Sequence, residues 1–223
     1  NIDYLTMEVS SQALKYHRVM GITYDVACFL NIGEDHISDI EHPNFEDYFS
    51  SKLKLFSQTK KAAICIDSPY SKRVLESCGN CEKVITFSSV DESADVYAYD
   101  IKKVGHDTHF TVRMPGYTGE FTLTIPGLFN VQNALAAISV CYLYGIPAEC
   151  MYVGLMKARS SGRMEVYSNA DSEIIVIVDY AHNKMSFETL FDSVKKEFPE
   201  RHISIVFGCP GKKALGRRHD LGI

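Results

Sequence analysis

The sequence predicts a doubly wound, mostly parallel α/β sheet with a small antiparallel sheet, followed by the start of a second, Rossmann-like α/β domain. Two observations predict this fold. Short apolar runs alternate with helical patterns up to about residue 87 and again after residue 174, which is typical of βαβ units. Between residues 96 and 125, apolar and polar residues alternate with a period of two, which indicates antiparallel strands with one solvated face.

Four short apolar runs in the first part of the chain are expected to be strands. Each run is continuous and too short for a buried helix, and this is typical of parallel strands that are buried on both faces. The expected strands cover residues 4–9, 25–31, 62–66 and 84–87.

Helical patterns separate these runs and begin at cap residues. Ser10 or Ser11 is expected to cap a helix that ends near residue 17, and Asn44 to cap a helix over residues 45–56. The apolar side chains of this second helix recur at helical spacing and share one face: Phe45, Tyr48, Phe49, Leu53 and Phe56.

The alternating region and the helix after it have clear boundaries. Turns at Gly105–Asp107 and Pro115–Gly119 divide residues 96–125 into three strands of an antiparallel meander. A helix is then expected over residues 130–144, because Gly145 is suited to end it.

The last part of the chain repeats the α/β pattern without completing it. It contains a buried strand, a helix and a second strand, expected at residues 174–178, 186–198 and 203–207. Two parallel strands cannot cover a core, so the chain is expected to stop inside a domain. The polar pair Ser160 and Ser161 predicts a boundary between a central domain (1–160), incomplete at its N-terminus, and the truncated beginning of a C-terminal domain (161–223).

The composition excludes several classes of protein. The 223 residues are 46% hydrophobic and 23% charged, as in globular proteins. No apolar run reaches the roughly 18–20 residues of a membrane-spanning helix, and a net charge of −5 gives no basic surface for nucleic acid.

Seven scattered cysteines suggest reduced thiols in the cytoplasm, and the lone pair Cys78 and Cys81 lacks the second half of a zinc site. The absent initiator methionine suggests a fragment.

Polar residues follow four of the expected strands directly, in the clusters Glu8–Ser11, Asn31–His36, Asp179–His182 and Gly208–Gly211. Ligands of open α/β sheets bind at the carboxyl ends of the strands. Each cluster alone is equally compatible with ordinary turn chemistry, but four such clusters in one chain indicate a ligand site.

These clusters belong to a longer ordered set of motifs: Met7–Leu14 with Arg18, Asn31–His36, Tyr48–Lys52, Pro126–Ala137, Ser161–Glu165, Val178–His182 and Phe207–Cys209. No single motif is specific, but together they cover nearly the whole chain. In this order they resemble the motifs of the Mur ligases, the ATP-dependent amino-acid ligases of peptidoglycan synthesis. The nearest branch is the tripeptide-forming one, which acts on the UDP-N-acetylmuramoyl-dipeptide.

The resemblance implies an enzyme that phosphorylates a substrate carboxylate with ATP, after which the amine of an amino acid attacks the acyl phosphate and ADP is released. Such a transfer needs cations on the phosphate oxygens, normally Mg²⁺, and two Mg²⁺ sites are implied. The implied partners are ATP, a UDP-N-acetylmuramoyl-peptide and an amino acid, with no nucleic acid and no membrane insertion. The implied location is the cytoplasm.

Glu8, His36 and Lys52 match the metal positions of the family. A carboxylate at Glu8 suits the first Mg²⁺, and His36 and Lys52 match the second, catalytic position. Lys52 becomes an anionic ligand if CO₂ carbamylates it, which requires a neutral amine and so a lowered pKa. Without the resemblance, an exposed helix lysine and a loop histidine are the simpler interpretations. His36 and Lys52 are sixteen positions apart, which is about two more than the resemblance to the family implies. The extra residues fall within Ile40–Pro43.

Seven further residues match binding positions of the family. Three match contacts to the UDP-muramoyl substrate, namely Ser10, Ser11 and Arg18. Four match contacts to the nucleotide, namely Asn133, Arg163, Asp179 and His182. The amide of Asn133 can pair with the adenine edge, and the carboxylate of Asp179 is suited to the ribose hydroxyls. Ser10 is also suited to cap the first helix.

The chain departs from the family pattern in two respects. It has no Gly-x-x-x-x-Gly-Lys-Ser/Thr loop; the resemblance places this loop before Asn1, so the 223 residues alone are expected to be inactive. After Cys209, the acidic residues that relatives often have are missing from Pro210–Ala214. Two alternatives remain: a sister amide ligase on the same scaffold, such as a folylpolyglutamate synthase, or a catalytically inactive scaffold.

Overall fold

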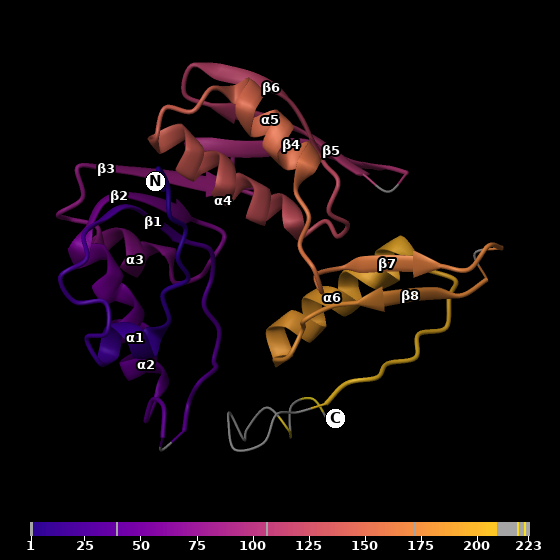
Figure 1. The fold of residues 1–223 in the computed structure, drawn as a ribbon, viewed down its shortest axis with the longest axis horizontal. Helices are drawn as coiled ribbons and strands as arrows, with labels where there is room; N and C mark the ends of the chain where they lie inside the picture. Colours follow the sequence, from indigo (N-terminus) through magenta and orange to yellow (C-terminus); the bar gives the residue numbers. More distant parts are fainter. Residues whose placement is uncertain are drawn as a thin grey trace.

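The computed structural model of the protein describes residues 2–38, 40–105, 107–171 and 173–208, together with residues 218 and 221. Within these residues, a six-stranded sheet has the strand order β1-β2-β3-β4-β5-β6 (Figure 1). Its strands are β1 (Tyr24–Phe29), β2 (Thr59–Cys65), β3 (Lys83–Ser88), β4 (Val96–Val104), β5 (Asp107–Met114) and β6 (Tyr117–Leu123). Neighbours are parallel from β1 to β4 and antiparallel from β4 to β6. The predicted meander is therefore confirmed, and it extends the parallel sheet.

Helices cover both faces of the parallel strands. They are α1 (Ser11–Lys15), α2 (Phe45–Leu53), the 3₁₀ helix η1 (Lys54–Gln58), α3 (Ser71–Ser77), α4 (Asn130–Leu143) and α5 (Ala148–Lys157). α4 packs across β1 to β4, α5 packs on β6, and α1 packs on α2. None of the described helices is long and apolar enough to cross a membrane.

Successive side chains of β2 enter different cores. Ala62 and Ile64 belong to the cluster that includes residues of α2 and α3, whereas Ala63 and Cys65 belong to the cluster that includes α4. All four side chains are buried. Since side chains alternate between the faces of a strand, a strand covered on both faces needs a continuous apolar run, as the sequence has.

Two helix boundaries follow from their caps as predicted. The side chain of Asn44 accepts a hydrogen bond from the Asp47 N–H at 2.9 Å and starts α2. Gly145, with φ +71°, follows α4, and the Ile146 N–H donates to the Cys141 carbonyl at 3.0 Å, which is the pattern of a Schellman motif. The predicted helix over residues 45–56 is divided between α2 and η1.

The last described part contains two antiparallel strands, β7 (Glu165–Ser168) and β8 (Ile175–Val178), followed by α6 (Lys184–Glu197). Asn183 starts α6 through a capping box, in which its side chain accepts from the Ser186 N–H. The predicted helix over residues 186–198 is thus confirmed. β7 and α5 were not among the predicted elements.

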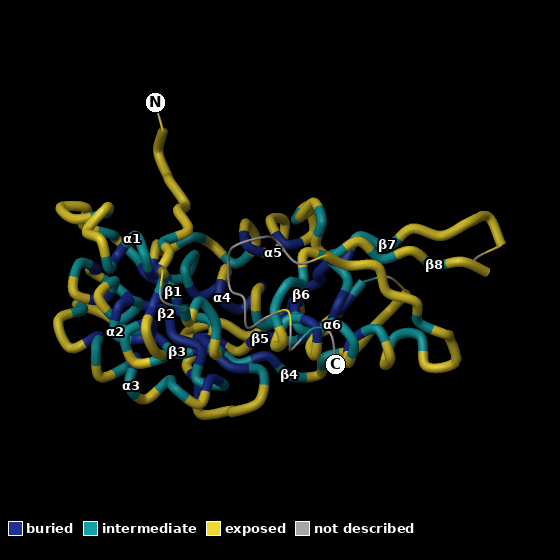
Figure 2. Tube along the Cα trace, turned by 90° about the horizontal axis from the view of Figure 1, so that it is seen from below, coloured by how far each residue is buried: buried dark blue, intermediate teal, exposed yellow. Residues whose placement is uncertain are grey.

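Two predicted strands are wrong. Residues 4–9 form no strand and are almost entirely exposed (Figure 2), and residues 203–207 form no regular structure. A strand needs a neighbouring strand to bond its backbone groups, and within the described residues neither segment has one. The strand predicted at 174–178 exists, but it is not buried: Val176 and Val178 are exposed on β8, which pairs antiparallel with β7.

The cluster beneath α2 gives the first prediction. Phe49 is fully buried there, so Phe49→Ala is expected to lower the free energy of unfolding by about 3–5 kcal/mol, since it removes apolar contacts and leaves a cavity. The measurement is urea unfolding of the chain. Met20→Ala, at a side chain that is 74% exposed, is the control and should have little effect. Equal effects of the two changes would contradict the packing described for α2.

Candidate functional site

Lys52, on α2, lies in a partly buried position close to two carboxylates. Burial lowers its pKa from the ordinary value, and the charges of Glu8 and Asp35 oppose this shift. Its Nζ lies 5.2 Å from the centroid of the Tyr48 ring. The structure therefore brings Glu8 and Lys52 into electrostatic contact, and it adds Asp35, to which the sequence had assigned no role. Lys52 is not the fully exposed helix lysine of the simpler interpretation.

His36 also lies near the Tyr48 ring. The centroids of the His36 and Tyr48 rings are 5.7 Å apart, so Tyr48 contacts both predicted catalytic residues. The His36 Nδ1 is 2.9 Å from the Glu41 Oε1. His36 also adopts a positive φ of 58°, which is uncommon for a residue other than glycine. In the part of the chain that the structure describes, no three His, Cys, Asp or Glu side chains gather as a metal site.

The two serines after Glu8 have different surroundings. The Ser10 Oγ accepts from the Ala13 N–H at 3.1 Å, which makes it the N-cap of α1, and the residue is exposed. Ser11 is buried, and its Oγ lies 2.9 Å from the His42 Nε2. The hydroxyl of Ser11 is thus used inside the protein, whereas Ser10 and the exposed Arg18 remain accessible to a ligand.

His42 links three elements through its ring. Besides Ser11, it contacts the Asp47 Oδ2 through Nδ1 at 2.6 Å, and the same oxygen accepts from the Lys15 Nζ at 2.6 Å. The pKa of Asp47 is lowered, first by the hydrogen bond from Lys15 and then by the one from His42. These bonds hold α1, α2 and the loop before α2 together.

Asn133 lies on the exposed side of α4. Its Nδ2 donates to the Asn130 Oδ1 at 2.8 Å, and the Asn130 Nδ2 donates to the Pro126 carbonyl. Asn133 is exposed, so its side chain is accessible to a ligand. Asn130 is the first residue of α4, and its side chain acts through the bond to the Pro126 carbonyl.

Asp179 joins the two strands of the last part. Its Oδ2 accepts from the Met164 N–H at 2.9 Å and its Oδ1 from the Ala181 N–H at 2.7 Å. Each carboxylate oxygen has two acceptor positions, so these bonds leave capacity for a ligand hydroxyl.

Arg163 and His182 both lie close to the ring of Tyr180. The Arg163 guanidinium is 4.8 Å from the centroid of the Tyr180 ring, and the centroids of the Tyr180 and His182 rings are 4.9 Å apart. Arg163 also lines a cavity of about 520 Å³ with Thr124, Pro126 and Phe198. The structure thus brings Arg163 and His182 together through Tyr180.

A hydrogen bond connects the last part with the loop that carries His36. The Asn183 Nδ2 donates to the Asp35 Oδ2 at 3.1 Å, and the Met185 sulfur lies 3.4 Å from where a Cβ on Gly33 would stand. The start of α6 therefore lies against residues 33–35. Asn183 has the position of an N-cap, a signal that could have identified it in the sequence.

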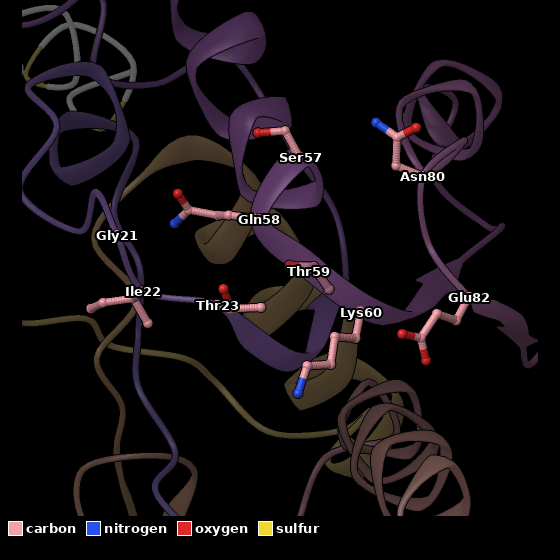
Figure 3. Close-up of a pocket in the computed structure, with 9 residues that line it drawn as sticks. All are labelled: Gly21, Ile22, Thr23, Ser57, Gln58, Thr59, Lys60, Asn80 and Glu82. Carbon is pink, nitrogen blue, oxygen red and sulfur yellow. The ribbon is translucent and has the colours of Figure 1, made fainter.

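A second cavity, of about 320 Å³, lies elsewhere (Figure 3). Its lining residues precede β1, β2 and β3 or begin β2, so it lies at the amino ends of the parallel strands. None of the predicted site residues lines it. The geometry therefore favours the loops around Lys52 as the candidate site, in agreement with the usual position of ligands in such sheets.

Burial disfavours the thiolate form of both cysteines in the C-x-x-C pair, Cys78 and Cys81. Burial raises the pKa of Cys78 to about 12 and also raises that of Cys81, which disfavours the thiolate that metal binding or redox chemistry requires. Cys209 and residues 210–214, which carry the departure from the family pattern, lie outside the described residues.

Comparison with known proteins identifies the family. Residues 1–141 match the Mur ligase middle domain, and residues 162–222 match the Mur ligase glutamate ligase domain. A UDP-N-acetylmuramyl-tripeptide synthetase of Bifidobacterium longum is 38% identical over 98% of the chain and 44% of its own length. A UDP-N-acetylmuramoyl-L-alanyl-D-glutamate–L-lysine ligase of Enterococcus faecalis is 36% identical over 98% of the chain and 44% of its own length.

Solved structures agree with the sequence matches. The structure of a UDP-N-acetylmuramoyl-L-alanyl-D-glutamate–2,6-diaminopimelate ligase superimposes with a TM-score of 0.71 and 26% identity, covering 96% of this chain and 44% of that one. A folylpolyglutamate synthase from Thermotoga maritima has a TM-score of 0.64 at 19% identity, over 88% of this chain and 43% of that one, and shares the fold. The chain spans less than half the length of these relatives. The matched domains, the ordered motifs and the fold together show that this chain belongs to the Mur ligase family.

Proposed function

We propose that this chain is part of an ATP-dependent ligase that joins an amino acid to a UDP-N-acetylmuramoyl-peptide in peptidoglycan synthesis. The reaction passes through an acyl phosphate and releases ADP and phosphate. The observation that carries the proposal is Lys52, held partly buried beside the carboxylates of Glu8 and Asp35 with a lowered pKa. The names of the relatives support the peptidoglycan substrate.

The side chains around Lys52 suit a divalent cation once Lys52 is carbamylated, since without it no three His, Cys, Asp or Glu side chains gather there among the described residues. Glu8 and Asp35 supply the carboxylate oxygens that Mg²⁺ prefers, and His36 adds an imidazole. An unmodified Lys52 has no lone pair to offer as an ammonium, but its carbamate would be a third anionic ligand. Bound Mg²⁺ would neutralise the phosphate oxygens of ATP during transfer. Two such cations, one on Glu8 and one on His36 with Lys52, are our proposal for the site.

The remaining predicted residues are proposed to bind the two large substrates. Ser10 and Arg18 hold the UDP-muramoyl part, and Ser11 supports them from within the protein. Asn133 reads adenine, Asp179 accepts from the ribose hydroxyls, and Arg163 with His182 contacts the nucleotide or its phosphates.

We also propose that the boundary between the central and C-terminal domains lies at Ser160 and Ser161. Ligase activity is proposed for the longer protein. The sequence contains no phosphate-binding Gly-Lys-Ser/Thr loop, so we expect the 223 residues alone to form no amide bond. Location in the cytoplasm follows from the substrates proposed.

The first test measures the ligase reaction itself. The protein translated from the complete gene is incubated with ATP, Mg²⁺, UDP-N-acetylmuramoyl-dipeptide and either lysine or diaminopimelate, and ADP and tripeptide are quantified. Lys52→Ala should reduce turnover by at least a hundredfold, on the order of the loss of a major electrostatic contact, and bicarbonate should not restore it. Lys54→Ala, at an exposed neighbour, is the control. Glutamate added to a folate substrate instead would favour the sister ligase, and no turnover with any acceptor would favour the inactive scaffold.

The second test concerns carbamylation. Only a neutral amine reacts with CO₂, and burial lowers the pKa of Lys52, so its carbamate should form at a lower pH than that of Lys54. Carbon-13 NMR with labelled bicarbonate detects the carbamate carbon. The signal should disappear in Lys52→Ala and persist in Lys54→Ala. A spectrum without a Lys52-dependent signal at any pH would remove carbamylation from the proposal.

The third test concerns Asp179. Binding of ATP and of 2′,3′-dideoxy-ATP to the complete protein is measured by calorimetry. A hydrogen bond to a charged group contributes about 1.5–3 kcal/mol, so the native protein should prefer ATP by roughly tenfold or more. Asp179→Ala should bind both nucleotides equally, whereas the exposed Asp171→Ala should keep the preference. If Asp179→Ala kept the full preference, Asp179 would have only its role between β7 and β8.

A further inference from the structure

The loop between β1 and α2 holds a carboxylate against His36 from inside the protein. The Glu41 Oε1 lies 2.9 Å from the His36 Nδ1, and the Ser38 Oγ donates to the Glu41 Oε2 at 3.4 Å. The Glu41 side chain is only 9% exposed, whereas that of His36 is 41% exposed. The Nδ1 edge of the imidazole is thus held by the protein, while the His36 side chain is partly exposed to solvent.

This contact determines which nitrogen of a neutral His36 carries the proton. An ionised carboxylate only accepts hydrogen bonds, so Glu41 requires a proton on Nδ1 and leaves a lone pair on Nε2. The other nearby carboxylate does not compete. The Asp35 Oδ2 is 3.9 Å from Nε2, beyond hydrogen-bond distance, and Asp35 instead accepts from the His36 N–H and from the Asn183 Nδ2.

The loop itself is held at three points. The His42 N–H donates to the His36 carbonyl at 3.2 Å, and the Ser38 N–H donates to the His42 carbonyl at 2.9 Å. The Lys15 Nζ donates to the Glu41 carbonyl at 3.1 Å. These bonds place the backbone on either side of Glu41.

His42 anchors this loop in the interior. Its ring is fully buried, and both nitrogens have partners on helices: Nδ1 donates to Asp47 on α2, and Nε2 contacts the hydroxyl of Ser11 on α1. Because the ring cannot turn without losing both bonds, Glu41 is tied to the frame of α1 and α2.

We propose that Glu41 is a positioning residue that holds His36 in the Nδ1–H tautomer, with the Nε2 lone pair presented to a divalent cation, and that His42 fixes the loop that makes this possible. The cation role of His36 rests on the proposed function, whereas the tautomer rests on the contacts alone. A carboxylate behind a ligating imidazole orients the ring and raises its basicity, and loss of such a partner typically weakens metal affinity by about 10–100-fold.

The first experiment reads the tautomer directly. Long-range proton–nitrogen NMR spectra of the 223-residue chain, recorded near pH 8 where an ordinary imidazole is neutral, separate the two ring nitrogens of each histidine. His36, assigned with His36→Gln, should show a protonated Nδ1 and an unprotonated Nε2. Glu41→Ala should give a mixture or the opposite tautomer. Glu41→Gln, which has nearly the same shape and can still accept from Nδ1 through its amide oxygen, should keep the native tautomer.

The matched control is Glu34→Ala, which removes an exposed carboxylate two positions before His36 and should leave the tautomer unchanged. An Nε2–H tautomer in the native chain, or an unchanged tautomer in Glu41→Ala, would overturn the proposal. Backbone chemical shifts outside residues 36–42 that match the native chain show that Glu41→Ala is folded, so that a tautomer change then reports the loss of the carboxylate.

The second experiment titrates the same chains with Mn²⁺ alone and follows paramagnetic broadening of the His36 ring signals. The native chain and Glu34→Ala should bind alike, and Glu41→Ala should bind about 10–100-fold more weakly. Equal affinity in Glu41→Ala and native chain would overturn the positioning role. Absence of Mn²⁺ broadening at His36 in the native chain, with the tautomer as expected, would instead overturn the cation role of His36 in the proposed function and leave the tautomer assignment standing.

Discussion

The two-sided burial of β1, β2 and β3 is the constraint on which the rest of the structure depends. Each of these strands has one set of side chains under α4 and another under α2 and α3, so a shift of one residue in register would exchange the two sets. The register therefore fixes where each strand ends. Because Phe29 ends β1 at one defined place, the loop that follows starts from a rigid point, and His36 with its partners is built from there.

Polar contacts, and not the apolar core, then determine the geometry of the site. α1 has five residues and could not be stable alone, yet it carries Ser11 and Lys15, which bond to His42, Asp47 and the Glu41 carbonyl. Ser11 and His42 are buried, where an unsatisfied partner is costly. Each bond therefore depends on the others, and the short helix, the loop and α2 behave as one unit around Lys52.

The sequence predicted the elements whose signals are local. Asn44 and Gly145 mark helix boundaries, and the apolar face of Phe45, Tyr48 and Phe49 identifies α2. The segments at 4–9 and 203–207 were predicted wrongly because an apolar run says nothing about a pairing strand.

The candidate site was predicted in the same uneven way. Glu8, His36 and Lys52 were found through family motifs. In the structure the charge of Glu8 acts on Lys52, and His36 and Lys52 both lie near the Tyr48 ring. Three contacts of the site were missed. Asp35 and Asn183 bond to each other although they are far apart in the sequence. Glu41 contacts His36, whose positive φ the sequence does not indicate. Ser11 was predicted to bind the substrate; it is buried, and its hydroxyl has a partner in His42 that the sequence did not indicate.

The chain formed by Ser11, His42 and Asp47 has a consequence for the recognition of enzymes by geometry. A hydroxyl, an imidazole and a carboxylate at 2.9 and 2.6 Å have the order and spacing of the nucleophile, general base and orienting acid of a serine hydrolase. A template search based on interatomic distances would select them. In this chain the imidazole is fully buried and the serine is nearly so, so no acyl group can reach the hydroxyl. Solvent access, and not the interatomic distances, distinguishes this structural hydrogen-bond network from a catalytic triad.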